Sequence, residues 1–151
     1  MVIIIDTREQ QPWDFGFHGI ATKSQKLETG DYTIEGSDKL ICIERKKSTG
    51  ELAVNLGLKK KQFDAEMERM NEFKYKYLLF EFSINDMLNF PKNSGIPSNL
   101  IKNVRINSKY MLKCLEEYQN KYEIEVIYAN NRDSAVNFAV ELLYKAQICE
   151  K

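Results

Sequence analysis

Residues 30–51 constrain the fold more than any other stretch, because they combine a hairpin pattern with charged residues at its open end. The segment reads GDYTIEGSDKLICIERKKSTGE, with apolar runs at 32–34 and 40–43 on either side of a polar cluster. That order is typical of a β-hairpin. If the turn is centred between positions 37 and 38, Asp31 and Glu44 are equidistant from it and face each other.

The second strand of this hairpin ends in Glu44-Arg45-Lys46. Side chains alternate along a strand, so Glu44 and Lys46 project to one side and Arg45 to the other. Two carboxylates and an ammonium therefore meet at one end of the hairpin. Carboxylate oxygens are the hard ligands that Mg²⁺ prefers, and a nearby cation can orient water or offset developing charge. The pattern indicates metal-assisted phosphodiester hydrolysis.

Two elements frame the hairpin. Residues 2–5 form a continuous β-branched apolar run that predicts a buried strand, and Asp6 to Glu9 follow directly at its end. Ser48 with Glu51 three positions later matches a capping box, so a helix is expected to begin there. Residues 15–26 have two glycines and weak periodicity, which we interpret as a loop or an irregular helical turn.

The rest of the chain alternates between helical and strand patterns. We expect strands at 75–82 and 124–128 and helices near 59–73, 83–90, 98–122 and 131–148, with a possible break at 107–108. Strands separated by helices predict an α/β domain with a mixed sheet. A chain of 151 residues can bury one sizeable core, so we expect a single domain over residues 1–151.

Composition constrains the cellular compartment of the protein more than its chemical activity. The formal net charge is zero, which gives no support for bulk attraction to nucleic acid. Basic residues nevertheless cluster at 45–47 and 59–61, and four more recur at helical spacing at 102, 105, 109 and 113. Each group either follows the DNA backbone or forms a solvated face. Three dispersed cysteines argue against disulfides or zinc and favour a reducing compartment. Neither a membrane span nor a signal peptide is expected.

The motifs taken together resemble a known family. Asp6-Thr7-Arg8-Glu9, Gly30-Asp31-Tyr32 and Glu44-Arg45-Lys46 look like the DxRE, GDY and ERK signatures of the XPF-type (xeroderma pigmentosum group F) structure-specific endonuclease domain. That domain is a branch of the PD-(D/E)xK superfamily. The resemblance implies a restriction-endonuclease-like three-layer α/β fold, with a central mixed β-sheet flanked by helices.

The resemblance also implies roles for particular residues. Asp31, Glu44, Asp6 and Glu9 resemble metal-binding and catalytic carboxylates, and Lys46 resembles the catalytic lysine. Arg8, Arg45, Lys47 and Lys60 are the residues expected to contact DNA. The implied cofactor is Mg²⁺, with Mn²⁺ as a substitute, and the implied substrate is DNA with branches, flaps or single-strand to double-strand transitions. A homodimer is expected, as is a bacterial or phage-infected cytoplasm, since compact phage or prophage versions look similar.

The chain departs from the family in two respects. The family usually has an aspartate four positions after the ERK lysine, and here that position is Gly50, followed by Glu51. Glu51 either caps the helix or supplies the missing carboxylate. The chain also has no room for the helix-hairpin-helix or helicase module common in the family. This puts in question whether the domain acts alone and whether it selects branched DNA.

Other interpretations of single residues and of function stay open. His18 is expected at the surface; Trp13 either closes the edge of the core or stacks on a base. Phe138 and Tyr144 belong either to the core or to a dimer face. The main competing function is a non-catalytic, DNA-binding partner subunit. A weaker alternative keeps catalysis but changes it to duplex nicking or exonuclease action.

Overall fold

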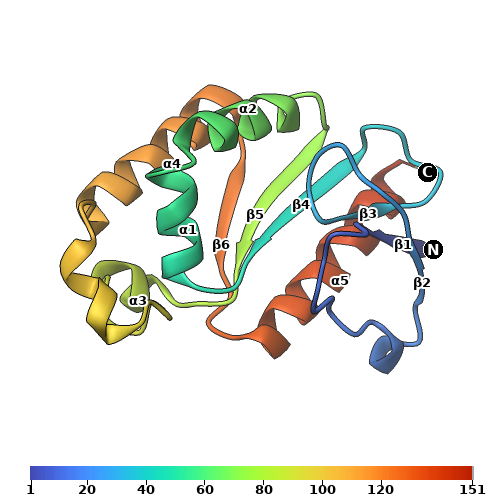
Figure 1. The fold of residues 1–151 in the computed structure, drawn as a ribbon. Helices are drawn as coiled ribbons and strands as arrows, with labels where there is room; N and C mark the ends of the chain where they lie inside the picture. The colour runs from blue at the N-terminus through green and yellow to red at the C-terminus, as the bar shows by residue number, and fades with distance from the viewer. Residues whose placement is uncertain (151) are drawn as a thin grey trace.

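A six-stranded mixed sheet forms the centre of the protein (Figure 1). The computed structural model describes residues 1–150. In chain order the strands are β1 (Val2–Ile5), β2 (Ala21–Ser24), β3 (Tyr32–Ile34), β4 (Ile41–Lys46), β5 (Tyr75–Phe80) and β6 (Glu125–Tyr128). They are arranged in space as β2-β1-β3-β4-β5-β6. The two pairings that involve β3 are antiparallel and the other three are parallel.

Helices cover both faces of this sheet. They are α1 (Thr49–Leu56), α2 (Lys60–Met70), α3 (Ile84–Leu88), α4 (Ser108–Tyr122) and α5 (Arg132–Cys149), with short 3-10 turns η1 (Gly16–His18) and η2 (Ser98–Asn103). In Figure 1, α5 lies on one face, whereas α1, α2 and α4 lie on the other. The expected three-layer α/β fold with a mixed central sheet is confirmed.

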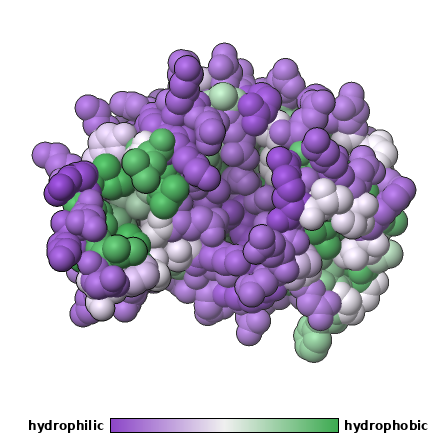
Figure 2. All heavy atoms as spheres, viewed as in Figure 1, coloured by the Kyte–Doolittle hydropathy of each residue, from purple (hydrophilic) through white to green (hydrophobic). Residues whose placement is uncertain are grey.

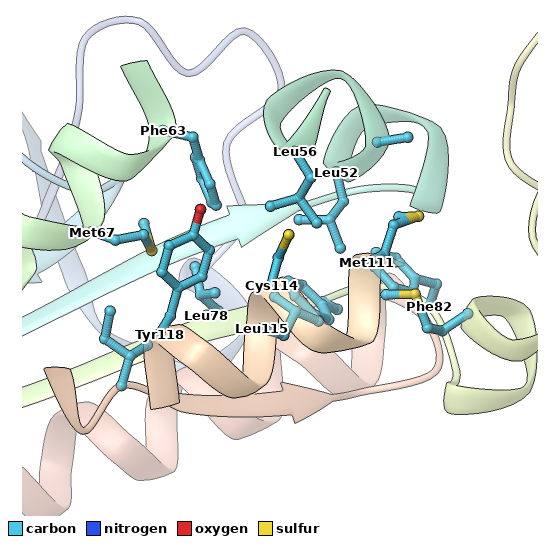
Figure 3. Packing of buried hydrophobic residues seen from close by; sticks show 14 of the residues in the cluster. Leu52, Leu56, Phe63, Met67, Leu78, Phe82, Met111, Cys114, Leu115 and Tyr118 are labelled. Carbon is cyan, nitrogen blue, oxygen red and sulfur yellow. The ribbon is translucent and has the colours of Figure 1, made fainter. Parts of the chain in front are cut away.

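The alternating side chains of β4 contribute to both cores. Ile41 and Ile43 are buried with the residues of α5, whereas Cys42 is buried with those of α1, α2 and α4. Figure 3 shows this second core, in which Leu52, Phe63 and Leu115 and other apolar side chains from these three helices converge over the sheet. Because Glu44 and Lys46 continue the Cys42 side of β4, they emerge where this core ends.

The predicted hairpin register is confirmed. Tyr32 pairs with Ile43 across β3 and β4, so the next position outward places Asp31 opposite Glu44. The Asp31 amide donates to the Ile43 carbonyl oxygen at 2.8 Å, and the Arg45 amide donates to the Asp31 carboxylate at 2.8 Å. Both bonds hold Asp31 at the end of the strand pair.

Helix boundaries also follow the expected signals. Ser48 caps α1 by accepting the Glu51 amide at 3.1 Å, and Gly57 follows its last residue. Asn107 caps α4 at the break expected within residues 98–122, and Asn131 caps α5. The aromatic and methionine stripe of α2, made of Phe63, Met67 and Met70, is buried as its spacing predicts.

The expectation for residues 15–26 was wrong in part. The segment contains the irregular turn η1, but it also contains β2, which runs parallel to β1 at the edge of the sheet. Its four residues, Ala21 to Ser24, are all exposed. A strand with no buried face shows no alternation of apolar and polar residues, so periodicity could not reveal it.

No helix within residues 1–150 is both long enough and apolar enough to cross a membrane.

Candidate active site

The Asp31 and Glu44 carboxyl groups meet at the open end of the hairpin. Glu44 is 5% exposed, and the strand register places Asp31 opposite it. Burial first, and then the charge of Asp31, raises the pKa of Glu44. Burial likewise raises the pKa of Asp31, despite the bonds it accepts. Two acidic groups this close cannot both ionise cheaply, so the pair holds a proton unless a cation replaces it.

Lys46 is the cation that the sequence places beside this pair. Its Nζ lies 4.0 Å from Glu44 Oε2, 3.9 Å from Glu51 Oε1 and 5.1 Å from the centre of the Phe63 ring. Burial opposes the charged form, but the surrounding carboxylates outweigh it and raise the pKa of Lys46. Lys46 is therefore a protonated ammonium, suited to stabilising negative charge rather than to accepting a proton.

Asp6 and Arg8 form a structural pair at the edge of the site. The Arg8 Nε donates to Asp6 Oδ2 at 2.8 Å, and the Leu27 amide donates to Asp6 Oδ1 at 2.8 Å. Burial opposes ionisation, yet these two bonds lower the pKa of Asp6. Both carboxylate oxygens of Asp6 are thus engaged in holding the loop before β3, which leaves less capacity for a metal than the sequence pattern implied.

Glu9 is engaged through a second group of buried contacts. Its Oε2 accepts from Arg45 Nη1 at 2.7 Å and from the Tyr32 hydroxyl at 2.9 Å. Tyr32 in turn stacks on Trp13, which is 2% exposed. Trp13 thus closes the edge of the core, as one of its two interpretations proposed, while His18 is exposed as expected.

Arg45 is buried, so its side chain does not reach the surface where the expected DNA contact would form. The side chain is 2% exposed and donates to Glu9 and to the carboxylate of Glu81, the latter at 2.5 Å. Trp13 Nε1 donates to the same Glu81 oxygen at 2.7 Å. Arg45 therefore ties the strand end of β4 to neighbouring segments, and its role is to hold Glu9 and the hairpin in place.

Position 50, where the family pattern has an acid, cannot take a side chain here. The Gly50 amide donates to the Ser94 carbonyl oxygen at 3.0 Å, and a Cβ on Gly50 would overlap that oxygen. The next residue, Glu51, gives its amide to the Ser48 cap, while its carboxylate lies at the Lys46 ammonium. Only the Ser48 half of the expected capping box forms, because the Glu51 side chain lies at the Lys46 ammonium rather than at the Ser48 amide.

Two acidic residues near the site were missed by the sequence analysis. Glu81 follows β5 and pairs with Arg45, as described above. Glu66 lies on α2, and its negative charge contributes to the raised pKa of Glu44. Each is brought to β4 by tertiary packing from a separate element, so no local motif could have identified them. The one sequence signal for Glu66 was its place one turn after Phe63 on a helix with a buried stripe.

The basic residues expected to contact DNA differ in whether their side chains are already bonded to other residues. Lys47 is exposed at the rim of a small cavity of about 180 Å³ that Arg8, Glu9 and Glu51 also line. Lys60 is bonded to Asp64 at 2.7 Å. Four further basic residues are exposed on the segment 87–115, which contains no acidic residue: Lys102, Arg105, Lys109 and Lys113. This segment therefore carries an excess of positive charge in a chain of zero net charge.

The same region also holds an apolar groove. Val54, Leu58 and Leu100 are exposed there, and the groove between α1 and residues 96–106 encloses about 370 Å³. Figure 2 shows hydrophobic residues gathered on this side of the molecule, at the left, beside a hydrophilic central surface.

The donor set fits a hard divalent cation. Glu44 Oε2 is buried without a hydrogen-bond partner, and it lies beside a second carboxylate at the end of a rigid strand. Oxygen donors with an unsatisfied charge are what Mg²⁺ and Mn²⁺ require. Within residues 1–150, no three His, Cys, Asp or Glu side chains already stand in a metal-binding cluster. Any ion would therefore rest on Asp31 and Glu44 first.

Comparisons with known proteins agree with this fold. XPF from Aeropyrum pernix in complex with DNA has a similar structure, with a TM-score of 0.71 and 17% identity over 97% of this chain. XPF from the same organism without DNA gives a TM-score of 0.68 and 18% identity over 94% of the chain. This chain matches 64% of the length of each. A comparison with curated proteins found no match.

The fold is a mixed-sheet α/β domain like that of the Aeropyrum pernix XPF structures. The model of the ERCC4 domain matches residues 5–142, and the chain belongs to that family. The resemblance drawn from the DxRE, GDY and ERK motifs is confirmed at the level of family and fold.

Proposed function

We propose that this protein is a metal-dependent DNA endonuclease that hydrolyses phosphodiester bonds at branched, flapped or junction DNA. The observation that carries the proposal is the buried Asp31 and Glu44 pair, with Glu44 Oε2 unpartnered and the Lys46 ammonium 4.0 Å from it. A buried pair of acids beside a lysine destabilises the fold, so a catalytic role is the simplest reason for it. The DNA in the Aeropyrum pernix XPF complex supports DNA as the substrate.

Asp31 and Glu44 would hold Mg²⁺ or Mn²⁺, which supplies polarisation of the scissile phosphate and acidification of a bound water. The residues of the chain perform the remaining tasks. Lys46 keeps its positive charge in a buried setting, where it stabilises the charge that builds on the phosphoryl oxygens. Arg45, bonded to Glu9 and Glu81, fixes the strand end that carries both Glu44 and Lys46.

A cleavage assay tests the proposal. End-labelled duplex, flap, fork and four-way-junction DNA are incubated with purified protein in Mg²⁺, Mn²⁺ or chelator. We expect cleavage near the branch of at least one branched substrate and none in chelator. Asp31→Ala and Lys46→Ala should each lower the rate by at least about 10²-fold, the usual cost of removing a group that stabilises the transition state.

Lys121→Ala provides the matched control, because this lysine is exposed near the end of α4. It should cleave like the wild type. Cleavage that survives in Asp31→Ala would remove the site assignment. Cutting of plain duplex or from DNA ends alone would favour the nicking or exonuclease alternative.

The second candidate function is a non-catalytic partner subunit that binds DNA within a nuclease complex. The observation that favours it is Gly50, which removes a carboxylate from the family pattern and leaves no space for one. Binding of branched DNA in the absence of any cleavage would support this alternative.

We also propose that the protein forms a homodimer through α5. Phe138, Tyr144 and Ile148 on this helix are 38%, 42% and 67% exposed, so core packing does not account for them. Light scattering at micromolar concentration should give twice the chain mass of 17.7 kDa. A measured mass equal to a single chain would contradict the dimer.

A further inference from the structure

Two arginines hold the segment that leads into the hairpin. Arg8 Nη2 donates to the Leu27 carbonyl oxygen at 2.6 Å, and Arg69 Nε donates to the Thr29 hydroxyl at 3.1 Å. Arg8 follows β1, whereas Arg69 lies in the last turn of α2, at the end that points toward this segment in Figure 1. Asp31 comes two residues after Thr29, so both guanidinium groups are close to the candidate active site.

Thr29 is a rigid anchor for the Arg69 side chain. Thr29 is 7% exposed, and its carbonyl oxygen accepts from Cys42 Sγ on β4 at 3.7 Å. The next residue, Gly30, has a φ of +80°, and a Cβ there would overlap Cys42 Sγ. Thr29 therefore has a fixed place against β4, and its hydroxyl fixes the direction of the Arg69 guanidinium. A guanidinium held in this way loses less conformational entropy when it binds a ligand.

Arg69 has no acidic partner within residues 1–150. Its side chain is exposed, and none of the ion pairs in this range includes it. Glu72, one turn later, pairs with Lys39 at 3.0 Å, whereas Lys60 at the other end of α2 pairs with Asp64 at 2.7 Å. A guanidinium has five N–H donors, and the threonine hydroxyl takes one of them. Arg69 therefore keeps the paired, planar donors that suit a phosphate.

The position of Arg69 extends a basic rim that the site already has. Arg8 and Lys47 both line the small cavity beside the site. Arg69 lies on the other side of the segment 27–29 from Arg8, toward α2. A DNA strand that reaches the site continues past it, and contacts with its phosphates fix its register. Arg69 is placed to supply one such contact.

We infer that Arg69 binds a phosphate of the DNA strand beside the candidate active site, and that Thr29 orients its guanidinium for this contact. The inference rests on the proposed nuclease function and gives Arg69 a role in holding the substrate rather than in the reaction. A basic residue in the last turn of a helix also favours the helix itself. The test therefore has to separate DNA binding from stability.

Fluorescence anisotropy of labelled flap DNA tests the inference, between about 50 and 200 mM salt and in chelator to prevent cleavage. Arg69→Ala should weaken binding by about 10-fold or more, the effect of losing one charged hydrogen bond. It should also lower the slope of log K against log salt by about one. Lys121→Ala, at an exposed position near the end of α4, is the control and should change neither quantity.

Two further variants separate the charge of Arg69 from its orientation. Arg69→Lys keeps the charge and should keep the slope, but it should bind less tightly than the wild type because an ammonium lacks the planar donors. Thr29→Val removes the hydroxyl that directs the guanidinium and no charge, so it should weaken binding without changing the slope. The Tm of each variant, measured in the same buffer, shows whether it is folded.

The outcomes separate this inference from the proposed function. If Arg69→Ala binds like Lys121→Ala, or loses affinity with an unchanged slope, the phosphate contact is overturned, while cleavage near a branch by the wild type would leave the proposed function intact. If the wild type neither cleaves nor binds branched DNA, both fail. Should Arg69→Ala not fold, wild-type affinity in both Arg69→Lys and Thr29→Val would overturn the inference.

Discussion

Arg45 and Glu81 form a buried ion pair that joins β4 to the end of β5, with Nε and Oε2 2.5 Å apart. Glu81 also accepts from Trp13 Nε1, so one carboxylate links three segments of the chain. Glu9 still pairs with Arg45 when Glu81 loses its charge, so the cost is that of weakening one charged hydrogen bond, about 1–3 kcal/mol, rather than that of an uncompensated charge. Glu81→Gln should therefore lower the free energy of unfolding by about 1–3 kcal/mol, measured by urea denaturation.

The control for this prediction is the exposed pair Lys23 and Glu35, 3.1 Å apart. Glu35→Gln should change stability by less than about 1 kcal/mol, because solvent screens surface pairs. Equal effects at Glu81 and Glu35 would mean that Arg45 is solvated and free to contact DNA.

The sequence predicted the hairpin and its register because both depend on local pattern. Asp31, Glu44 and Lys46 are set by turn position and by strand alternation, which residues 30–46 contain in full. Glu66 and Glu81 are set by how α2 and β5 pack on β4, and no spacing in the chain encodes that packing. The sequence therefore revealed the centre of the candidate site but not the acids that neighbouring elements bring to it.

The same distinction explains the residues whose roles changed. Arg45 was expected at DNA because the family motif groups it with Glu44 and Lys46, but alternation along β4 turns it toward Glu9 and the other core. Asp6 follows a buried strand as predicted, yet the Leu27 amide and Arg8 occupy its oxygens. Neither Leu27 nor the packing around Arg45 could be inferred from motif spacing.

Asp31→Asn should stabilise the protein when no metal is bound. Burial raises the pKa of Asp31 from 3.8 in the unfolded chain to about 6. The folded state therefore binds this proton more tightly than the unfolded state, so stability falls as pH rises from about 4 to 6 and stays lower above that range. An asparagine does not titrate and avoids this destabilisation, which amounts to roughly 1–3 kcal/mol.

The measurement is thermal unfolding in chelator at about pH 4 and about pH 7, on either side of the range in which Asp31 titrates. Asp31→Asn should have a higher Tm than the wild type at the higher pH. The difference should shrink at the lower pH, where the side chain at position 31 is neutral in both proteins. A lower Tm for the variant at the higher pH would show that Asp31 is a structural residue rather than one retained at a cost to stability.

Restoring the acid of the family pattern at position 50 should fail. In Gly50→Asp, the new side chain would overlap the backbone of Ser94, which cannot move as a flexible side chain can. Overpacking of this kind costs about 1–3 kcal/mol, more than the roughly 1 kcal/mol that replacing a helical glycine can return. Gly50→Ala should be destabilised as well, since its Cβ meets the same oxygen.

Urea denaturation and the cleavage assay check this prediction together. We expect Gly50→Asp to be less stable than the wild type and to cleave DNA no faster. A variant that gains activity without losing stability would show that the loop at residues 91–97 yields easily and that position 50 can carry an acid.

The acid-free segment at residues 87–115 should contribute to DNA binding through phosphate contacts. Lys102 and Arg105 are exposed there, and no acidic residue of the segment offsets them. Reversing either charge, as in Lys102→Glu or Arg105→Glu, should weaken binding of flap DNA.

The salt dependence of binding should change as well. Because each phosphate contact releases about one counterion, the slope of log K against log salt should fall by about one for each phosphate that the variant no longer neutralises. Lys121→Glu is the control, because this exposed lysine lies near the end of α4, outside the acid-free segment. Fluorescence anisotropy between about 50 and 200 mM salt, in Ca²⁺ or chelator to prevent cleavage, gives both the affinity and the slope. Unchanged slopes in Lys102→Glu and Arg105→Glu would identify this segment as a solvated face and move the DNA path to the rim formed by Arg8 and Lys47.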